Sequence, residues 1–183
     1  MPFAVAISLF VCYLLAALAS SHTTEAEAPK LLHPIDKFMN TSEEIWVLNT
    51  TENEPRDCKK DKTYNMTENA TYFVRSYQDG NETIAESLVG EFENIYENRD
   101  GIYIYGDRRV HAEVLLYASG DKKCGVVQVF AYINDTNVAW RDLRVVGRPN
   151  ETSTIDEDCK KEYDDFVEAL RKPSTSPYKN SCL

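Results

Sequence analysis

The feature that most constrains the fold is a succession of strand-like segments between residues 44 and 147, each rich in Val, Ile, Tyr, Phe or Thr. Asp, Asn and Gly separate these segments, as is typical of β-strands joined by short turns. Asp79-Gly80 and Asp100-Gly101 are dipeptides that favour hairpin turns. We predict strands over residues 44–51, 58–64, 70–78, 83–94, 101–107, 111–119, 123–135 and 138–147. Seven or eight antiparallel strands usually close into a barrel, because closure leaves no exposed strand edge.

The hydrophobic period changes after the last of these segments. Side chains with apolar character recur there at helical spacing, at Cys159, Tyr163, Phe166, Val167 and Leu170. Thr154 and Glu157 form a capping box before this face, and Pro173 ends the segment. Residues 33–39 predict a second, shorter helix. The sequence therefore predicts an all-β fold, an antiparallel barrel followed by one C-terminal α-helix.

An apolar run over residues 3–19 opens the chain. Ala17-Leu18-Ala19 fits the small-X-small cleavage rule, so we expect a signal peptide over residues 1–19. No basic residue precedes the run, which departs from the usual pattern, and a transmembrane segment is the alternative interpretation. Residues 20–183 would then form a single domain with a loose N-terminal segment, secreted into an extracellular fluid.

Seven Asn-X-Ser/Thr sequons follow this segment, and each is a potential glycan acceptor. So many sequons behind an export signal favour a secreted glycoprotein. They lie at Asn40, Asn49, Asn65, Asn69, Asn81, Asn134 and Asn150.

Charge and cysteine content narrow the classes of partner. The formal net charge is −10, from 20 Lys and Arg against 30 Asp and Glu. This acidity argues against nucleic acid and anionic membranes, which both need a basic patch. After the predicted cleavage, Cys58, Cys124, Cys159 and Cys182 remain. An even number in a secreted chain predicts two disulfide bonds, with three pairings open at this point.

The sequence carries none of the common catalytic motifs. His22, His33 and His111 are scattered, and no Gly-x-Ser-x-Gly or His-Glu-x-x-His motif occurs. Residues 79–83 begin like a calcium loop but lack its Gly at position six and its Glu at position twelve. We therefore expect a binding protein and not an enzyme, with no cofactor and no metal.

The spacing of the cysteines and the tail adds a family resemblance. Cys159-x3-Tyr163-x2-Phe166, followed by Ser176-Pro177-Tyr178-x3-Cys182-Leu183, resembles the closing segment of the tick salivary lipocalins, the histamine-binding protein family. Comparable elements upstream are Asn53-Glu54-Pro55, Tyr103-Ile104-Tyr105, Gly-Asp-Lys-Lys before Cys124, and Trp140.

This resemblance covers roughly residues 44–183 and implies an eight-stranded lipocalin-type barrel with the helix packed on its outside. It also implies the pairing of the cysteines: Cys58 with Cys182, and Cys124 with Cys159. Long closed loops of this kind typically contribute a few kcal/mol, about 2–4 per bond.

The family binds histamine in acidic pockets inside the barrel. Carried over by position, the resemblance implies a ligand site that includes Glu54, Ser87, Tyr103, Tyr105, Val138 and Trp140. Ser87 and Val138 stand where the family has acids, and Gly125 replaces an acid of a second pocket. A buried ammonium without a carboxylate is costly. We therefore expect an interior lined by these aromatics and by Val127 and Val129 to bind an apolar ligand, such as a sterol, fatty acid or eicosanoid.

The resulting functional hypothesis is a secreted, monomeric lipocalin that modulates host immune or inflammatory responses, including those of dendritic cells, as in the japanin-like branch of the family. One alternative is a scavenger of histamine or serotonin. Another is a protein-binding decoy that uses the outer surface of the barrel.

The sequon at Asn134 also predicts which side chains face inward. If residues 125–134 form one strand with an outward glycan, Gln128, Phe130 and Tyr132 lie outside. The inward side chains are then Val127, Val129, Ala131 and Ile133.

Overall fold

The computed structural model describes residues 33–149 and 155–182. The predicted signal peptide, the sequon at Asn150 and the predicted cap at Thr154 lie outside these ranges. In the part of the chain that the structure describes, no helix is long and apolar enough to cross a membrane.

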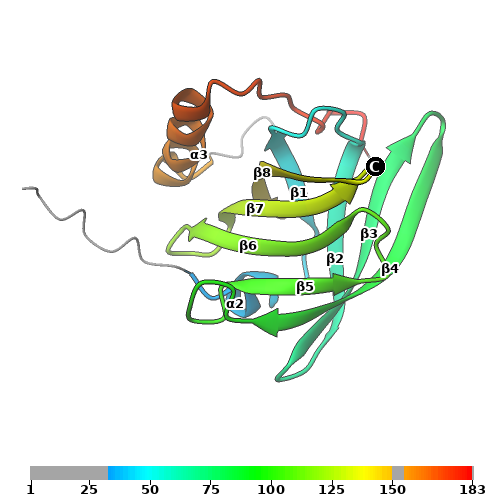
Figure 1. The fold of residues 1–183 in the computed structure, drawn as a ribbon, viewed down its shortest axis with the longest axis vertical. Coiled ribbons are helices and arrows are strands. Elements are labelled where there is room, and N and C mark those ends of the chain that lie inside the picture. Colours follow the sequence, from blue (N-terminus) through cyan, green and yellow to red (C-terminus); the bar gives the residue numbers. More distant parts are fainter. Residues whose placement is uncertain (1–32, 150–154, 183) are drawn as a thin grey trace, which may run out of the picture. The chain divides into compact units, whose positions relative to one another are not determined.

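Within the described residues the strands form one closed antiparallel barrel in the order of the sequence, with β8 pairing back onto β1 (Figure 1). Their bounds are β1 Ile45–Thr50, β2 Asp57–Met66, β3 Ala70–Asp79, β4 Glu82–Glu93, β5 Gly101–Tyr105, β6 Val110–Ala118, β7 Cys124–Ile133 and β8 Thr136–Val146. The predicted eight-stranded barrel is confirmed, and each predicted strand overlaps one of these.

One predicted turn is wrong. Asp100-Gly101 does not turn the chain; Asn98 and Arg99 do, with φ of 60° and 56°, and Gly101 already belongs to β5. The buried Asp100 carboxylate accepts hydrogen bonds from the backbone N–H groups of Ile95 and Tyr96, at 2.9 and 3.1 Å. Gly101 is small for a packing reason, since a Cβ there would lie 2.4 Å from the Ile95 side chain.

The C-terminal helix α3 (Glu157–Leu170) packs against the outside of the barrel, on β6, β7 and β8. Asp156 and not Thr154 is its N-cap, because the Asp156 carboxylate accepts a hydrogen bond from the Cys159 N–H at 2.8 Å. Tyr163 is the main buried side chain of the helix and packs in a cluster with Val126 and Leu143 from the outer face of the barrel.

Two disulfide bonds tie the tail and the helix to the barrel, and both predicted pairings are confirmed. Cys58 pairs with Cys182 across 124 residues, and Cys124 pairs with Cys159 across 35 residues. The tail between α3 and Cys182 contacts β1, where Thr50 and Thr175 exchange backbone hydrogen bonds of 2.9 and 3.0 Å. The C-terminal segment is therefore held against the barrel at β1 and β2.

The short helix α2 (Ile35–Met39) closes one end of the barrel. Ile35, Phe38 and Met39 are at most 2% exposed and join the core inside the barrel. Gly125 makes room for this plug, because a Cβ there would lie 3.0 Å from the Phe38 ring. We refer to this apolar closed end as the floor.

The predicted orientation of β7 is confirmed for the residues in the core. Val127, Val129 and Ala131 are at most 1% exposed and line the interior, whereas Tyr132 is 52% exposed. Asn134 lies beyond the strand, in the turn to β8.

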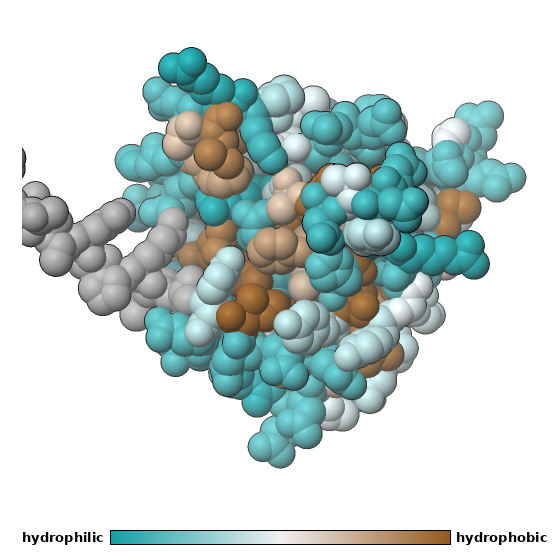
Figure 2. Space-filling view, viewed as in Figure 1, coloured by the Kyte–Doolittle hydropathy of each residue, from teal (hydrophilic) through white to brown (hydrophobic). Residues whose placement is uncertain are grey.

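The face of the molecule seen in Figure 2 is mainly hydrophilic, with hydrophobic residues exposed between the hydrophilic ones. Most of the described sequon asparagines are exposed, and Asn49 on β1 is half-buried. The exposed ones are Asn40, Asn65, Asn69, Asn81 and Asn134. Their glycosylation remains a prediction.

Candidate ligand-binding site

Along strand β8, the inward side chains change from apolar to charged and back to apolar between the floor and the open end of the barrel. In that direction, these side chains are Val146, Arg144, Asp142, Trp140 and Val138. The charged pair in the middle is at most 1% exposed. The interior is thus apolar at the floor, charged in the middle and apolar again toward the open end.

Two arginines and three carboxylates form this charged layer. Arg75 on β3 donates to both oxygens of Asp61 on β2, at 2.8 and 2.7 Å, and to Glu113 Oε1 on β6 at 2.8 Å. Arg144 donates to both oxygens of Glu113, at 2.7 and 2.8 Å, and to Asp142 Oδ2 at 2.9 Å. Bidentate pairs of this kind are stronger and more directional than hydrogen bonds between neutral groups.

Three buried groups of this layer, on Glu113, Arg75 and Arg144, keep their charges. Burial alone raises the pKa of Glu113, but the guanidinium groups of Arg144 and Arg75 hold the pKa well below its usual range. Burial lowers and the carboxylates raise the pKa of both arginines, and the carboxylates prevail. All three groups therefore stay ionised at physiological pH, since each pKa moves away from neutrality.

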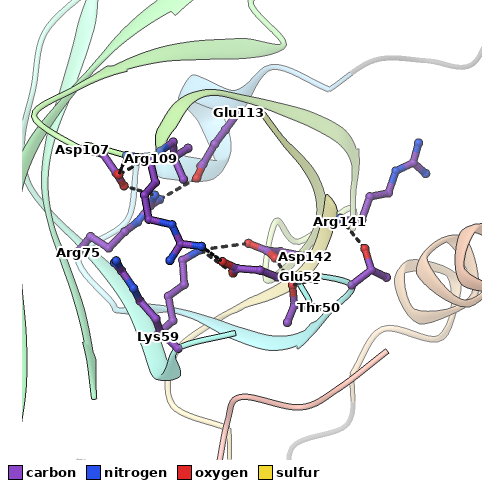
Figure 3. Close-up of polar contacts among 12 residues, drawn as sticks. Thr50, Glu52, Lys59, Arg75, Asp107, Arg109, Glu113, Arg141 and Asp142 are labelled. Carbon is purple, nitrogen blue, oxygen red and sulfur yellow. Dashed lines mark hydrogen bonds and ion pairs between the residues drawn. The ribbon is translucent and has the colours of Figure 1, made fainter. Parts of the chain in front are cut away.

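A second tier of charges lies between this layer and the open end (Figure 3). Lys59 on β2 places its ammonium 3.8 Å from Asp142 Oδ2 and 4.0 Å from Glu52 Oε2. Arg109, in the β5–β6 loop, donates to Glu52 Oε1 at 3.0 Å. The Thr50 hydroxyl donates to Asp142 Oδ1 at 2.7 Å and accepts the Glu52 N–H at 3.1 Å, which fixes the start of the β1–β2 loop.

The pKa of the Glu52 carboxyl is raised at this position. Burial raises its pKa, the neighbouring Asp142 adds to the rise, and Lys59 and Arg109 oppose it. The net shift is upward. The two cations therefore do not fully offset the cost of holding a carboxylate at this depth.

A cavity of about 560 Å³ opens at this end of the barrel, and we call it the mouth pocket. Its apolar wall is formed by Ile133, Val138 and Trp140, and charged groups stand at its edge. The full lining is Thr51, Glu52, Asn53, Glu54, Arg109, Ile133, Asn134, Thr136, Val138, Ala139, Trp140 and Lys172. Its volume falls within the usual range for small-molecule sites, about 300–1,000 Å³.

Three of the residues predicted from the resemblance lie together at this pocket. Trp140 is 3% exposed and Val138 is half-buried, both facing inward, while Glu54 is exposed at the edge. Whether they contact a ligand remains a prediction.

The other three predicted site residues do not line the interior, and this part of the prediction is wrong. Tyr103 and Tyr105 are 45% and 54% exposed, because Ile102 and Ile104 on the same strand take the inward positions. Side chains alternate along a strand, so both pairs cannot face inward. Ser87 faces outward for the same reason, since its neighbour Leu88 packs in the core.

The charged interior is the part of the site that the sequence analysis missed. A weak signal was present in the strand parity: Arg75 has the same parity as the buried Phe73 and Tyr77, and Asp142 the same as Trp140. Charged residues are rarely fully buried, so alternation alone does not distinguish them from outward residues on an irregular strand. The expected uniformly apolar interior is corrected accordingly.

Comparisons with known proteins were made on the sequence and on the fold. No protein-family model matches the sequence, and no curated protein sequence matches it. The fold is similar to that of the siderocalin Ex-FABP, a protein described as functioning through dual ligand specificities, with a TM-score of 0.58 and 7% identity over 78% of this chain and 93% of that one. The fold is that of the lipocalins.

Two crustacyanin subunits give further examples of this lipocalin fold. Apocrustacyanin C1 matches with a TM-score of 0.51 at 8% identity, and apocrustacyanin C2 with 0.50 at 10% identity. Each match covers 76% of this chain and 78% of the other. At such identities the likeness concerns the fold alone.

Proposed function

We propose that this protein binds a small ligand with a substantial apolar part in the mouth pocket. The observation that carries the proposal is the apolar wall of Ile133, Val138 and Trp140 in a cavity of about 560 Å³ at the open end of a barrel whose other end is closed. Fatty acids, eicosanoids and sterols have the required apolar surface. The charged layer fills the barrel below, so the ligand lies in the outer part of the barrel.

The pairing of the buried acids argues against an amine scavenger. Glu52 already accepts a hydrogen bond from Arg109 and lies near Lys59, and Asp142 is shared by Arg144, Lys59 and Thr50. The ammonium of histamine or serotonin would have to displace one of these built-in cations. The gain from a new ion pair would then be offset by the loss of an old one.

The wider role that we propose is a secreted modulator of host inflammation or immunity. It rests on the resemblance of the cysteine framework and tail to tick salivary lipocalins, whose implied disulfide pairing is the one observed. Withholding a lipid mediator, or delivering one to a host cell such as a dendritic cell, would both follow from binding in the mouth pocket.

The exposed tyrosines favour a second candidate, a protein-binding decoy. Tyr103 and Tyr105 on β5 and Tyr132 on β7 present large aromatic side chains outside the barrel. Tyrosine is enriched at protein interfaces. Replacing Tyr103 and Tyr105 by Ser should abolish the effect on host cells under this candidate and leave it unchanged if the mouth pocket is responsible.

Titration calorimetry tests the main proposal. The protein purified from insect cells and stripped of lipid is titrated with a fatty acid, an eicosanoid, cholesterol, histamine and serotonin. Val138→Trp should fill the pocket and remove binding, whereas Asn137→Trp, on the exposed side of the same strand, should leave it unchanged. Tight binding of an amine with no binding of any apolar compound would overturn the proposal.

A further inference from the structure

A smaller cavity lies under the mouth pocket, and we call it the inner cavity. Its volume is about 10 Å³, room for about one water molecule. Four cationic and two anionic residues contribute to its lining, which is Glu52, Arg56, Lys59, Arg75, Asp107, Arg109, Val110 and Trp140. Glu52, Arg109 and Trp140 also line the mouth pocket, so these three side chains stand between the two spaces.

Two hydrogen-bond donors on side chains that line the inner cavity lack an acceptor among the described residues. Arg75 is 1% exposed and its Nη1 has no hydrogen-bond partner, with Asp107 Oδ2 at 3.5 Å. Trp140 is 3% exposed, and its Nε1 also has none. Buried donors are nearly always paired, so this set indicates a place for an additional acceptor.

Lys59 adds a charge to this set. Its ammonium is 3.8 and 4.0 Å from the nearest carboxylate oxygens, longer than a hydrogen bond, and 5.6 Å from the centre of the Trp140 ring. The side chains that carry these three groups come from β2, β3 and β8 and line one small space. An acceptor that carries negative charge suits this space best.

Glu52 presently supplies the nearest negative charge from the side of the mouth pocket. It belongs to the β1–β2 loop, and its carboxylate lies against both Arg109 and Lys59. Burial raises the pKa of this carboxyl, so its charge is held at a cost. A second carboxylate arriving from the mouth pocket would meet the same two cations.

We infer that the inner cavity, together with the space that the Glu52 carboxylate leaves when it moves aside, is the subsite for the carboxylate head group of the ligand. Lys59, Arg109 and the Trp140 N–H receive this head group, and Glu52 is a built-in competitor which the ligand displaces. The inference rests on the proposed function and deepens it, because it selects fatty acids and other lipid acids over sterols. The apolar chain would then lie along Ile133 and Val138 in the mouth pocket.

A matched pair of probes tests the head group. Dodecanoate and dodecanol share one apolar chain and differ in the group that would reach the inner cavity. We expect the wild-type protein to bind dodecanoate at least about tenfold more tightly, the size of effect that one charge-assisted hydrogen bond gives. Titration calorimetry at pH 7.4 measures both affinities.

Two variants should shift this preference in opposite directions. Lys59→Met should lower the affinity for dodecanoate by about tenfold and leave the affinity for dodecanol unchanged. Lys62→Met, on the exposed face of β2, is the control. Glu52→Gln should raise the affinity for dodecanoate severalfold, and Glu93→Gln at an exposed position is the control. General destabilisation cannot produce a gain for one variant and a loss for the other.

The outcomes separate the inference from the function on which it rests. Equal affinities for the acid and the alcohol in the wild type, unmoved by Lys59→Met and Glu52→Gln, would overturn the carboxylate subsite and leave the mouth pocket standing. A loss of dodecanoate affinity in Glu52→Gln would overturn the competitor role of Glu52. If neither compound binds, both the subsite and the proposed function fail.

Discussion

The floor and the middle of the barrel interior are built from opposite chemistry. At the floor, Ile35, Phe38 and Met39 of α2 close the barrel with fully buried apolar side chains. In the middle of the barrel, a layer of paired charges is at most 3% exposed and consists of Asp61, Arg75, Glu113, Asp142 and Arg144. One sheet of strands supports both regions.

The difference separates stability from recognition. Burial of apolar area at the floor stabilises the fold directly. A buried network of ion pairs contributes little by comparison with an apolar core, because the desolvation cost offsets the attraction. A paired charged layer directly under a pocket does, however, supply fixed charges to a ligand without further desolvation. We therefore assign stability mainly to the floor, and recognition to the mouth pocket and the second tier of charges that lies on the charged layer.

The largest expected effect comes from breaking the centre of the charged layer. Glu113→Gln leaves Arg75 and Arg144 buried with a neutral partner, so the free energy of unfolding should fall by about 4 kcal/mol. Urea denaturation measures the change. The exposed Glu93→Gln should alter stability by no more than about 0.5 kcal/mol. A loss below about 1 kcal/mol in Glu113→Gln would show that the layer tolerates an unpaired charge, against the account.

The floor should behave differently from the charged layer in binding. Phe38→Ala should lower the free energy of unfolding by about 3 kcal/mol, because it leaves a cavity against Gly125 and Leu115. The affinity of the folded variant for dodecanoate should be unchanged. A binding loss of tenfold or more would mean that the floor takes part in recognition.

Acid should weaken the charged layer before the floor. The pKa of Glu113 is lower in the folded protein than its ordinary value of 4.5, so its stabilising contribution is complete above that value and declines as pH falls below it. The stability difference between wild type and Glu113→Gln should shrink by up to about 1.4 kcal/mol per pH unit in this range. Urea denaturation from pH 6 to pH 3 follows it. A constant difference would contradict the shift.

The smallest expected change in stability concerns the second tier of charges. The Arg109 side chain is 30% exposed, so Arg109→Gln should cost less than about 1 kcal/mol of unfolding free energy. Its effect should be seen in ligand binding, because the affinity for dodecanoate should fall and the affinity for dodecanol should not. Arg108→Gln, one residue away and exposed, is the matched control. Equal effects of the two variants on dodecanoate would show that only overall charge matters.

Most of the fold could be predicted from the sequence, because strand composition and helical period are local signals. The ranges of the strands and of α3 follow from such patterns, and the disulfide pairing followed from the resemblance of Cys159 and Cys182 to a known tail. The prediction of a turn at Asp100-Gly101 was wrong. A glycine is needed at position 101 because the Ile95 side chain packs against it, and not because the chain turns there.

The site was only partly predictable, because burial of charge depends on partners far apart in the sequence. Asp61, Arg75, Glu113 and Arg144 come from four strands and can be buried only because each finds the others. Trp140 and Val138 were placed correctly inside the barrel, since apolar side chains need no such partner. Tyr103 and Tyr105 were misplaced because the alternation of β5 gives the interior to either the tyrosines or the isoleucines, and the isoleucines occupy it.

A crystal structure with a brominated fatty acid tests the central claim most directly, because the anomalous signal of bromine locates the chain of the ligand. The account predicts bromine in the mouth pocket beside Ile133, Val138 and Trp140, with the carboxylate directed toward Lys59 and Arg109 and Glu52 moved away from them. Bromine on the outer face of β5 beside Tyr103 and Tyr105, with the mouth pocket unchanged, would contradict it.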